Sequence, residues 1–288
     1  MDNTFKNSKK DAILVAYTIV MFLVPIVLAL YTPGLLWLSV ITFFYIWMIV
    51  NGQNSSMHHH THWSTFVNDK YNKIYDVLLS VAFGFQTSLW RYTHLQHHKH
   101  VNDHPVDGVT KDPVSVYKYN PEKQELANLY TYSFKSAWED NYKELLTRFN
   151  FGHFKQLKRE MWAFRIYLIA ILILNPFFGA WMLGTYFLIY VVNNMNSYGE
   201  HWGALNRRGD TTQDSIGIYS KWYNIVGFNA GLHQEHHHKP GTHWTLLPTI
   251  TPLLHPDRVI VKHGVHITNN PFWDHFVLLL KGEKAIPK

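Results

Sequence analysis

The hydrophobic pattern begins with a long uncharged stretch, residues 12–68, which contains no Asp, Glu, Lys or Arg. Its apolar part ends near Val50, and Thr32-Pro33-Gly34 interrupts it with the residues of a turn. About 20 apolar residues in a helix cross the ~30 Å hydrocarbon layer of a membrane. The stretch therefore predicts a membrane hairpin whose two helices span residues 12–31 and 35–50.

A second uncharged stretch covers residues 166–199 and breaks at Asn175-Pro176. A proline disfavours helix at the residue before it, so this break predicts another hairpin, with spans at residues 161–174 and 177–192. Because both spans are short, a single long helix is the alternative. The apolar segment 74–90 contains Asp76, and we expect it to be an interfacial or buried helix that does not cross the membrane.

The charge distribution predicts the orientation of these spans. Neither hairpin turn carries a charge, whereas the Lys and Arg residues lie on the other side of the spans. By the positive-inside rule that side is cytoplasmic, together with both termini and with residues 51–160 and 193–288. The expected fold is a single all-α integral membrane domain, residues 1–288, with four transmembrane helices and a cytoplasmic helical cap. A bacterial inner membrane and an endoplasmic reticulum membrane fit this pattern equally well.

Composition narrows the chemistry. The chain has 20 His, as many as Asp and Glu together, and neutral imidazole is a common ligand of transition metals. It has no Cys, which excludes disulfides, thiolate zinc sites, iron–sulfur clusters and rubredoxin centres within the chain. A net charge of +6 suits nucleic acid, anionic lipid or an acidic protein. The apolar stretches favour the last two, and no nucleic-acid partner is expected.

The histidines fall into clusters with helical spacing. Residues three or four apart share one face of a helix, so each cluster can aim two or three imidazoles at one point. Each cluster also lies just beyond or between the predicted hairpins. A metal centre needs all of them on one side of the membrane, which favours a hairpin at Asn175-Pro176 over one long helix. The clustered residues are His58 and His62; His94, His97 and His98; His201; and His233, His236 and His237.

The first cluster leaves a choice among four histidines in "HHHTH". His58 and His62 lie one turn apart and are the predicted ligands. His59 also pairs with His62, at three residues, and is the main alternative. His60 points roughly away from both.

The order H-x-x-x-H, H-x-x-H-H, H-x-x-H-H, with hairpins between the boxes, resembles the membrane fatty-acid desaturase and hydroxylase superfamily. That superfamily includes alkane hydroxylases and carotenoid ketolases. "HLQHHKHVNDHPVDG" (residues 94–108) resembles its second box and "GLHQEHHHKPG" (231–241) its third. "SYGEHWG" (197–203) resembles the N-Y-x-E-H-Y-G motif of the alkane hydroxylases. Ser197 replaces the Asn of that motif, which leaves open a role for Asn196 beside the metal.

The resemblance implies a non-haem di-iron centre held by nine histidines. Oxidation of an unactivated C–H bond with O2 also needs a redox metal with open positions, which favours iron over zinc. Neighbouring polar groups can orient the rings. The implied ligands are His58, His62, His94, His97, His98, His201, His233, His236 and His237, and the neighbours expected to orient them are Asp103, Asp107, Asn196, Glu200 and Glu235.

The expected reaction is O2-dependent, two-electron oxidation of a long apolar chain, first of all the desaturation of a fatty-acyl or lipid substrate. Hydroxylation or ketolation of an alkane, fatty acid or carotenoid is the alternative within this class. A His-rich divalent-metal transporter or a metal sensor are the alternatives outside it. A transporter places ligands near the bilayer midplane, yet residues 12–50 and 166–192 contain no His.

The electrons have to come from another protein. The chain has neither Cys, nor a His-Pro-Gly-Gly segment of the cytochrome b5 type, nor a G-x-G-x-x-G nucleotide loop. We therefore expect a separate donor of the ferredoxin, rubredoxin or cytochrome b5 type, with its reductase. Such carriers are often acidic, which suits a basic cap.

Overall fold

The computed structural model describes residues 4–103, 106, 110–118, 127–138, 154–201, 204 and 214–254. Within these residues every helix or strand element is a helix, and an isolated antiparallel bridge joins Phe5 and Phe66. The all-α prediction is confirmed to this extent. The chain divides into two compact units, Met1–Tyr92 with Ala137–Val192, and Thr93–Ser136 with Asn193–Lys288.

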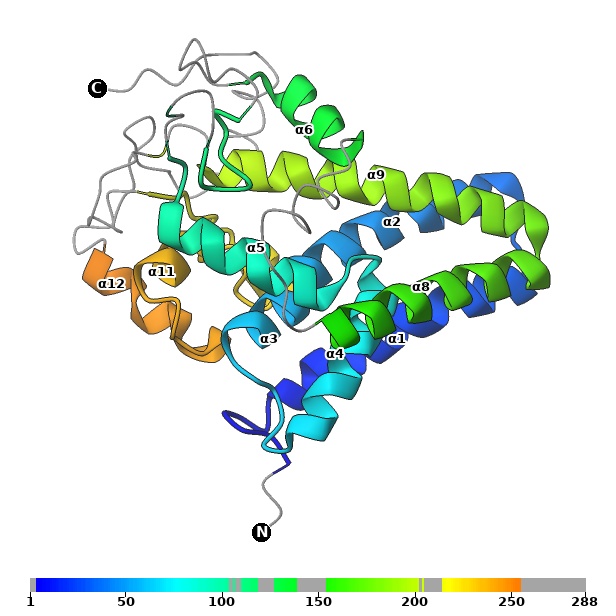
Figure 1. Cartoon of the computed structure of the whole chain (residues 1–288), viewed down its shortest axis with the longest axis horizontal. Coiled ribbons are helices and arrows are strands. Elements are labelled where there is room, and N and C mark those ends of the chain that lie inside the picture. Colours follow the sequence, from blue (N-terminus) through cyan, green and yellow to red (C-terminus); the bar gives the residue numbers. More distant parts are fainter. Residues whose placement is uncertain are drawn as a thin grey trace. The chain divides into compact units, whose positions relative to one another are not determined.

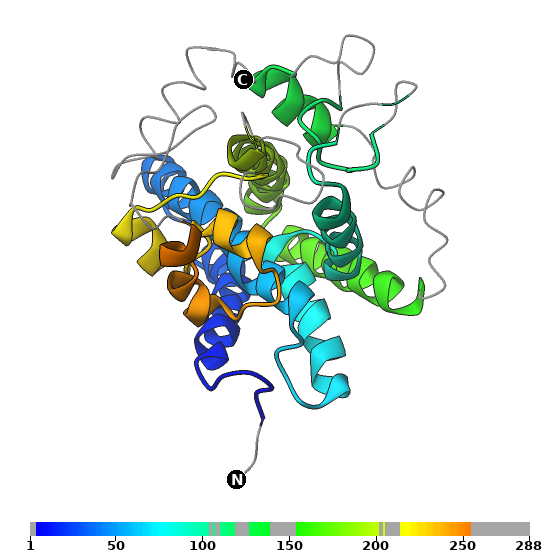
Figure 2. The ribbon, with the colours of Figure 1, turned by 90° about the vertical axis from the view of Figure 1, so that its left-hand side faces the viewer.

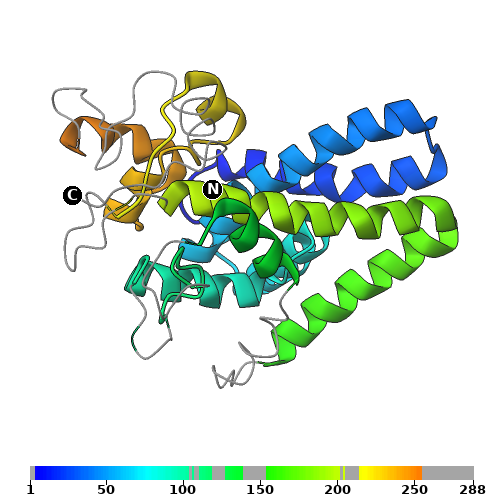
Figure 3. The same ribbon diagram turned by 90° about the horizontal axis from the view of Figure 1, so that it is seen from above.

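The first unit contains the predicted N-terminal hairpin, formed by α1 (Asp11–Leu30) and α2 (Leu35–Gly52), which run side by side in Figures 1 and 3. The second helix is longer than predicted. It continues through the π-helical turn η1 (Gln53–Met57) into α3 (His58–His62), so one helical segment joins the apolar span to the first histidine cluster.

The second hairpin consists of α8 (Phe154–Leu174) and α9 (Pro176–His201), and the chain breaks between them at Asn175, as the sequence predicted. The Asn175 side chain holds both hairpin turns together. Its oxygen accepts the N–H of Phe178 at 3.0 Å, and its amide donates to Ala29 O at 3.2 Å and to Thr32 Oγ1 at 2.6 Å.

Three helical segments in the described part of the chain are long and apolar enough to cross a membrane: Asp11–Leu30, Leu35–His62 and Pro176–His201. The sequence predicted a fourth span, residues 161–174. The helix α8 that contains it is not among the three. Its N-terminal half carries Lys155, Lys158, Arg159 and Glu160, and Arg165 follows within the apolar stretch.

The helix α4 (Asp69–Phe83) packs against α1 and α8. The segment 74–90, expected to be one interfacial or buried helix, is divided, because α4 ends at Phe83 and another helix begins at Thr87. Leu79 and Phe83 are fully buried in the core of this unit. At the end of α4, Gly84 adopts φ +75°, and a Cβ at this position would lie 2.5 Å from the ring of Tyr186. Only glycine combines that conformation with this close approach.

The second unit is built from shorter helices. α5 (Thr87–His100) enters it from the first unit, and α6 (Leu129–Trp138) packs Leu129 and Tyr132 against Tyr198 of α9. The helices α10 (Lys221–Val226), α11 (His233–His238), η2 (Trp244–Thr249) and α12 (Thr251–Leu254) follow. η2 packs against both α11 and α12, and Figure 2 shows this group in orange.

Candidate metal centre

A four-histidine cluster lies inside the second unit. His97 comes from α5, His201 from the end of α9, and His233 and His237 from α11. One ring nitrogen of each lies within 4.8 Å of those of the other three, and all four side chains are buried. The Nε2 atoms of His201 and His233 are 3.2 Å apart. Two nitrogens bound at about 2.1 Å to one ion lie roughly 3 Å apart when they meet it at a right angle, so this spacing fits a shared metal.

A buried carboxylate orients the first of these rings. The Nδ1–H of His97 donates to Asp112 Oδ2 at 2.9 Å, which directs Nε2 the other way. Burial lowers the pKa of His97, but the charge and hydrogen bond of Asp112 outweigh that effect and raise the pKa above its ordinary value. Asp112 is itself held by the backbone N–H groups of Asn102 at 2.7 Å and Val114 at 2.9 Å.

Asp214 supports two further rings. Its backbone oxygen accepts the Nδ1–H of His201 at 3.1 Å, and its Oδ1 lies 3.5 Å from Nδ1 of His237. Burial, together with the neighbouring histidines, holds the pKa of His237 well below its ordinary range, so this imidazole is neutral. Neither of its ring nitrogens has a hydrogen-bond partner among the described residues, although the side chain is buried. A bound metal ion would relieve that cost, and the cluster therefore fits one.

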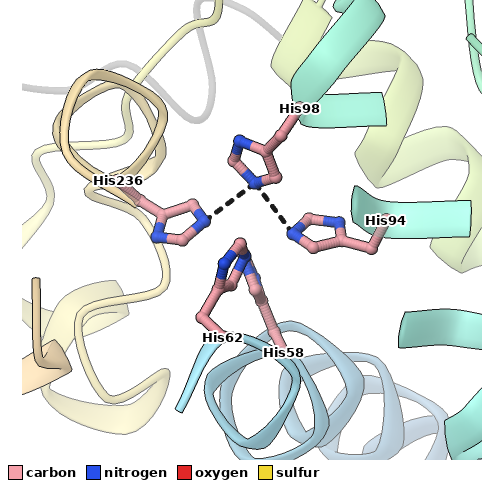
Figure 4. Close-up of side chains that lie close together, drawn as sticks. All are labelled: His58, His62, His94, His98 and His236. Atoms are coloured by element: carbon pink, nitrogen blue, oxygen red, sulfur yellow. Dashed lines mark hydrogen bonds between the residues drawn. The ribbon is translucent and has the colours of Figure 1, made fainter. Parts of the chain in front are cut away.

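A second group of histidines in this unit contains His94 and His98 of α5 and His236 of α11. Figure 4 shows their rings turned toward one another. The Nε2 of His98 lies 2.9 Å from that of His94 and 3.0 Å from that of His236. These spacings resemble the spacing in the four-histidine cluster, and three imidazoles are again directed at one point.

The first histidine cluster lies in the first unit, at the end of the long second span. His58 and His62 project side by side from α3, with ring centroids 5.3 Å apart (Figure 4). One ring nitrogen of each lies within 4.8 Å of the other. The two residues predicted as ligands therefore share one face of a single helical turn.

The other two histidines of "HHHTH" face carboxylates of the first unit. The backbone N–H of Thr65 donates to Nδ1 of His60 at 3.2 Å, and Nε2 of His60 lies 3.3 Å from Asp76 Oδ1. Nε2 of His59 lies 3.8 Å from Asp11 Oδ1. Both rings are buried, so neither is the solvent-exposed group that a run of histidines commonly is.

Glu200 and Glu235 were both expected to orient the metal ligands, and their side chains make different contacts. Glu200 Oε2 lies 3.8 Å from Nε2 of His233, and the amide of Asn196 donates to Glu200 Oε1 at 2.9 Å. Glu235 accepts a hydrogen bond from Thr251 Oγ1 at 2.6 Å, and this contact ties α11 to α12. Burial raises the pKa of Glu235.

Asp103 accepts the backbone N–H groups of Lys111 at 2.8 Å and Asp112 at 3.0 Å. Asp103 therefore holds the loop that contains Asp112, and it supports His97 only through Asp112. Asp107 lies outside the described residues. Asp112 and Asp214 were not predicted from the sequence, although among the described residues both contact the four-histidine cluster directly. The available signal was weak: Asp112 precedes Pro113 in a turn, and Asp214 lies between two of the histidine motifs.

A comparison with protein families gave a match. The model of the fatty acid desaturase family matches residues 31–270, a range that includes all nine predicted ligands. The comparisons with curated proteins and with solved structures gave no match. The apolar helices are those of a membrane protein, and the histidine clusters are compatible with the iron on which this family typically depends. The chain belongs to the fatty acid desaturase family and is a lipid-modifying membrane oxidoreductase.

Proposed function

We propose that this protein is a di-iron enzyme that uses O2 to introduce a double bond into a long acyl chain. The buried four-histidine cluster supports this proposal most directly, because its rings are positioned by Asp112 and Asp214 and one of them is neutral with unsatisfied nitrogens. A structural zinc site closes with four ligands and has no use for the further histidine groups of this chain. Their number suits a redox centre of two ions.

The proposed ligands fall into two sets. His97, His201, His233 and His237 hold one iron, and His94, His98 and His236 contribute to the other. His58 and His62 complete the second set, because they share a face of α3 and resemble the first box of the family. Bound iron would supply the oxidising power for C–H cleavage, in the balance –CH2–CH2– + O2 + 2 electrons + 2 H+ → –CH=CH– + 2 H2O.

The residues of the chain orient the metal and exclude water. Asp112 keeps the Nδ1 proton of His97 and directs the Nε2 lone pair inward. Asp214 does the same for His201 through its backbone oxygen. Burial of all four rings keeps bulk water away from the oxidising centre, which limits side reactions.

The proposed topology has four spans, with the metal site and both termini in the cytoplasm. Residues 161–174 of α8 form the fourth span. Its apolar stretch from Ile166 ends at the Asn175 break, which is tied to the turn of the first hairpin. Lys155, Lys158 and Arg159 at its start belong on the cytoplasmic side. Arg165 would have to reach the interface with its long side chain.

The two electrons require a separate donor, a small acidic carrier of the ferredoxin, rubredoxin or cytochrome b5 type with its reductase. The proposal rests on the absence of Cys from the chain and on its net charge of +6. Opposite charges speed the encounter of two proteins and fix their orientation.

Metal analysis and product analysis on the same preparation test this function. The purified protein should hold two irons and, with O2, a reductant and long-chain acyl lipids, convert saturated chains to alkenes seen by mass spectrometry. Alcohol or ketone products would replace the desaturase by the hydroxylase or ketolase. His58→Ala and His62→Ala should each lose about one iron, whereas His59→Ala, the matched control, should keep both. Bound zinc with zinc transport into vesicles, or full iron in both ligand variants, would overturn the proposal.

A further inference from the structure

A single buried carboxylate contacts two of the helices that carry histidine boxes. Asp76 lies in the middle of α4, and its side chain is 7% exposed. Its Oδ1 accepts a hydrogen bond of 2.6 Å from Nη2 of Arg91 on α5. The same oxygen lies 3.3 Å from Nε2 of His60 on α3. Nδ1 of His60 accepts the backbone N–H of Thr65 at 3.2 Å, so Nε2 is the ring nitrogen on the side of the carboxylate.

The backbone of Asp76 adds a second contact to the same helix. Its carbonyl oxygen accepts the hydroxyl protons of Ser80 at 2.7 Å and of Thr87 at 2.9 Å. The backbone N–H of Thr87, the first residue of α5, donates in turn to Ser80 Oγ at 2.9 Å. One turn of α4 therefore holds α5 at Thr87 and again at Arg91.

The two held residues of α5 lie on the same face of the helix as two of the proposed metal ligands. Thr87, Arg91, His94 and His98 follow one another at intervals of four, three and four residues, so they form one stripe along the helix. A helix fixed at the first two positions cannot rotate about its axis without breaking those contacts. The direction of the two histidines is thereby set from the start of the helix.

α3 is held in a similar way, from the side opposite to its predicted ligands. His60 lies two residues from both His58 and His62, which is about 200° around the helix from each. Its contacts with Thr65 and Asp76 therefore hold the back of α3 while the predicted ligands occupy the front.

We propose that Asp76, with Arg91 and His60, is a buried clamp that positions two histidine-bearing helices for metal binding. Asp76 is a positioning residue, and the inference rests on the proposed function because it takes His58, His62, His94 and His98 as ligands. Arg91 balances the charge of the carboxylate. Burial raises the pKa of Asp76, but the His60 contact and the Arg91 charge outweigh it and keep that pKa below the usual range.

A purely stabilising ion pair is the competing explanation, so the test must separate metal affinity from stability. Asp76→Asn keeps the shape of the side chain and removes its charge. We expect iron at one of the two sites to bind at least tenfold more weakly, measured by chelator competition, since supporting residues typically contribute 10–100-fold in metal affinity. The matched control is Asn175→Ala, which breaks the polar contacts between the hairpin turns just before the start of α9, 26 residues before the histidine of that helix, His201. It should lower the melting temperature and leave both iron affinities unchanged.

A double substitution tests the pairing itself. In Asp76→Asn/Arg91→Gln two uncharged amides can hydrogen-bond in place of the ion pair, so iron affinity should recover relative to Asp76→Asn alone. If Asp76→Asn does not yield folded protein, Arg91→Gln gives the comparison, because Arg91 is partly exposed and its loss leaves α4 intact.

The outcomes are distinct. Wild-type protein with two irons and an Asp76→Asn variant of equal iron affinity would overturn the clamp and leave the proposed function standing. Equal losses of affinity in Asp76→Asn and Asn175→Ala would show that stability alone is measured, and would also overturn it. Wild-type protein that binds no iron would overturn the proposed function instead.

Discussion

Glu160 gives the stability of this protein a pH dependence that can be derived from its surroundings. The carboxylate lies on α8 and is fully buried. Its Oε2 accepts the backbone N–H of Ser88 at 2.9 Å and its Oε1 accepts the Ser88 hydroxyl at 2.6 Å, so it caps the start of α5. Burial raises the pKa of Glu160 to about 7, although the Ser88 hydrogen bonds oppose that change.

The direction in which stability changes with pH follows from the pKa of Glu160 in the folded and in the unfolded chain. In the unfolded chain the carboxyl has a pKa of 4.5, so the folded protein binds this proton more tightly. The favourable contribution is fully present below about pH 4.5 and is lost as the pH rises toward 7. The difference between the two pKa values corresponds to a change of roughly 3 kcal/mol in the free energy of unfolding. Above pH 7 the buried charge costs about that much relative to an uncharged group of the same shape.

Glu160→Gln removes the charge and keeps the cap, since an amide can accept the Ser88 N–H and donate to its hydroxyl oxygen. We expect the variant to melt about 5 °C higher than wild type at pH 8, and the difference to shrink as the pH falls to 5. Tryptophan fluorescence during heating in detergent measures this. Asp69→Asn, at an exposed carboxylate at the start of α4, is the control and should change little at either pH. A variant less stable than wild type at pH 8, or a difference independent of pH, would refute the reasoning.

Two further predictions concern the four-histidine cluster and the core. Asp112→Asn weakens the acceptor for the Nδ1–H of His97, and we expect 10–100-fold weaker binding of one iron in chelator competition, with the other iron retained; equal affinity for both irons would contradict the assigned role. Gly84→Ala places a Cβ 2.5 Å from the Tyr186 ring at φ +75°, so its melting temperature should fall by several degrees, whereas Gly34→Ala, with nothing within 4 Å of its Cβ, should melt like wild type.

The helices could be predicted from the sequence wherever composition and backbone geometry coincide. Asn175 precedes a proline, and the helix ends there because a residue before proline avoids the helical conformation. At Val50 the apolar composition and the helical backbone do not end together. The apolar composition ends, yet the helix continues, because Gln53 donates its amide to Phe83 O at 2.8 Å and Ser55 donates its hydroxyl to Asn51 O at 2.6 Å. Hydrogen bonds from these polar side chains to backbone oxygens allow the helix to continue where hydropathy predicts its end.

The carboxylates that support the four-histidine cluster could not be predicted in the same way. Asp103 and Glu235 were chosen because they lie near histidines in sequence, and the fold uses them to hold the Asp112 loop and Thr251. Asp112 and Asp214 reach the rings from loops whose paths depend on the whole second unit. Sequence distance is a poor guide to such contacts, because a hydrogen bond needs an approach of about 3 Å from any part of the chain.

Helical spacing therefore determines which histidines share a face, but not where that face points. His94 and His98 would share a face in any α-helix with this sequence. Their direction depends on Thr87 and Arg91, which carry no metal-binding signature and are held by α4. A substitution at Asp76 leaves every histidine motif intact and is nevertheless expected to weaken the metal site. The histidine motifs alone would predict that such a variant binds iron normally, whereas the contacts of Asp76 predict weaker binding. A measurement of iron affinity distinguishes these two predictions.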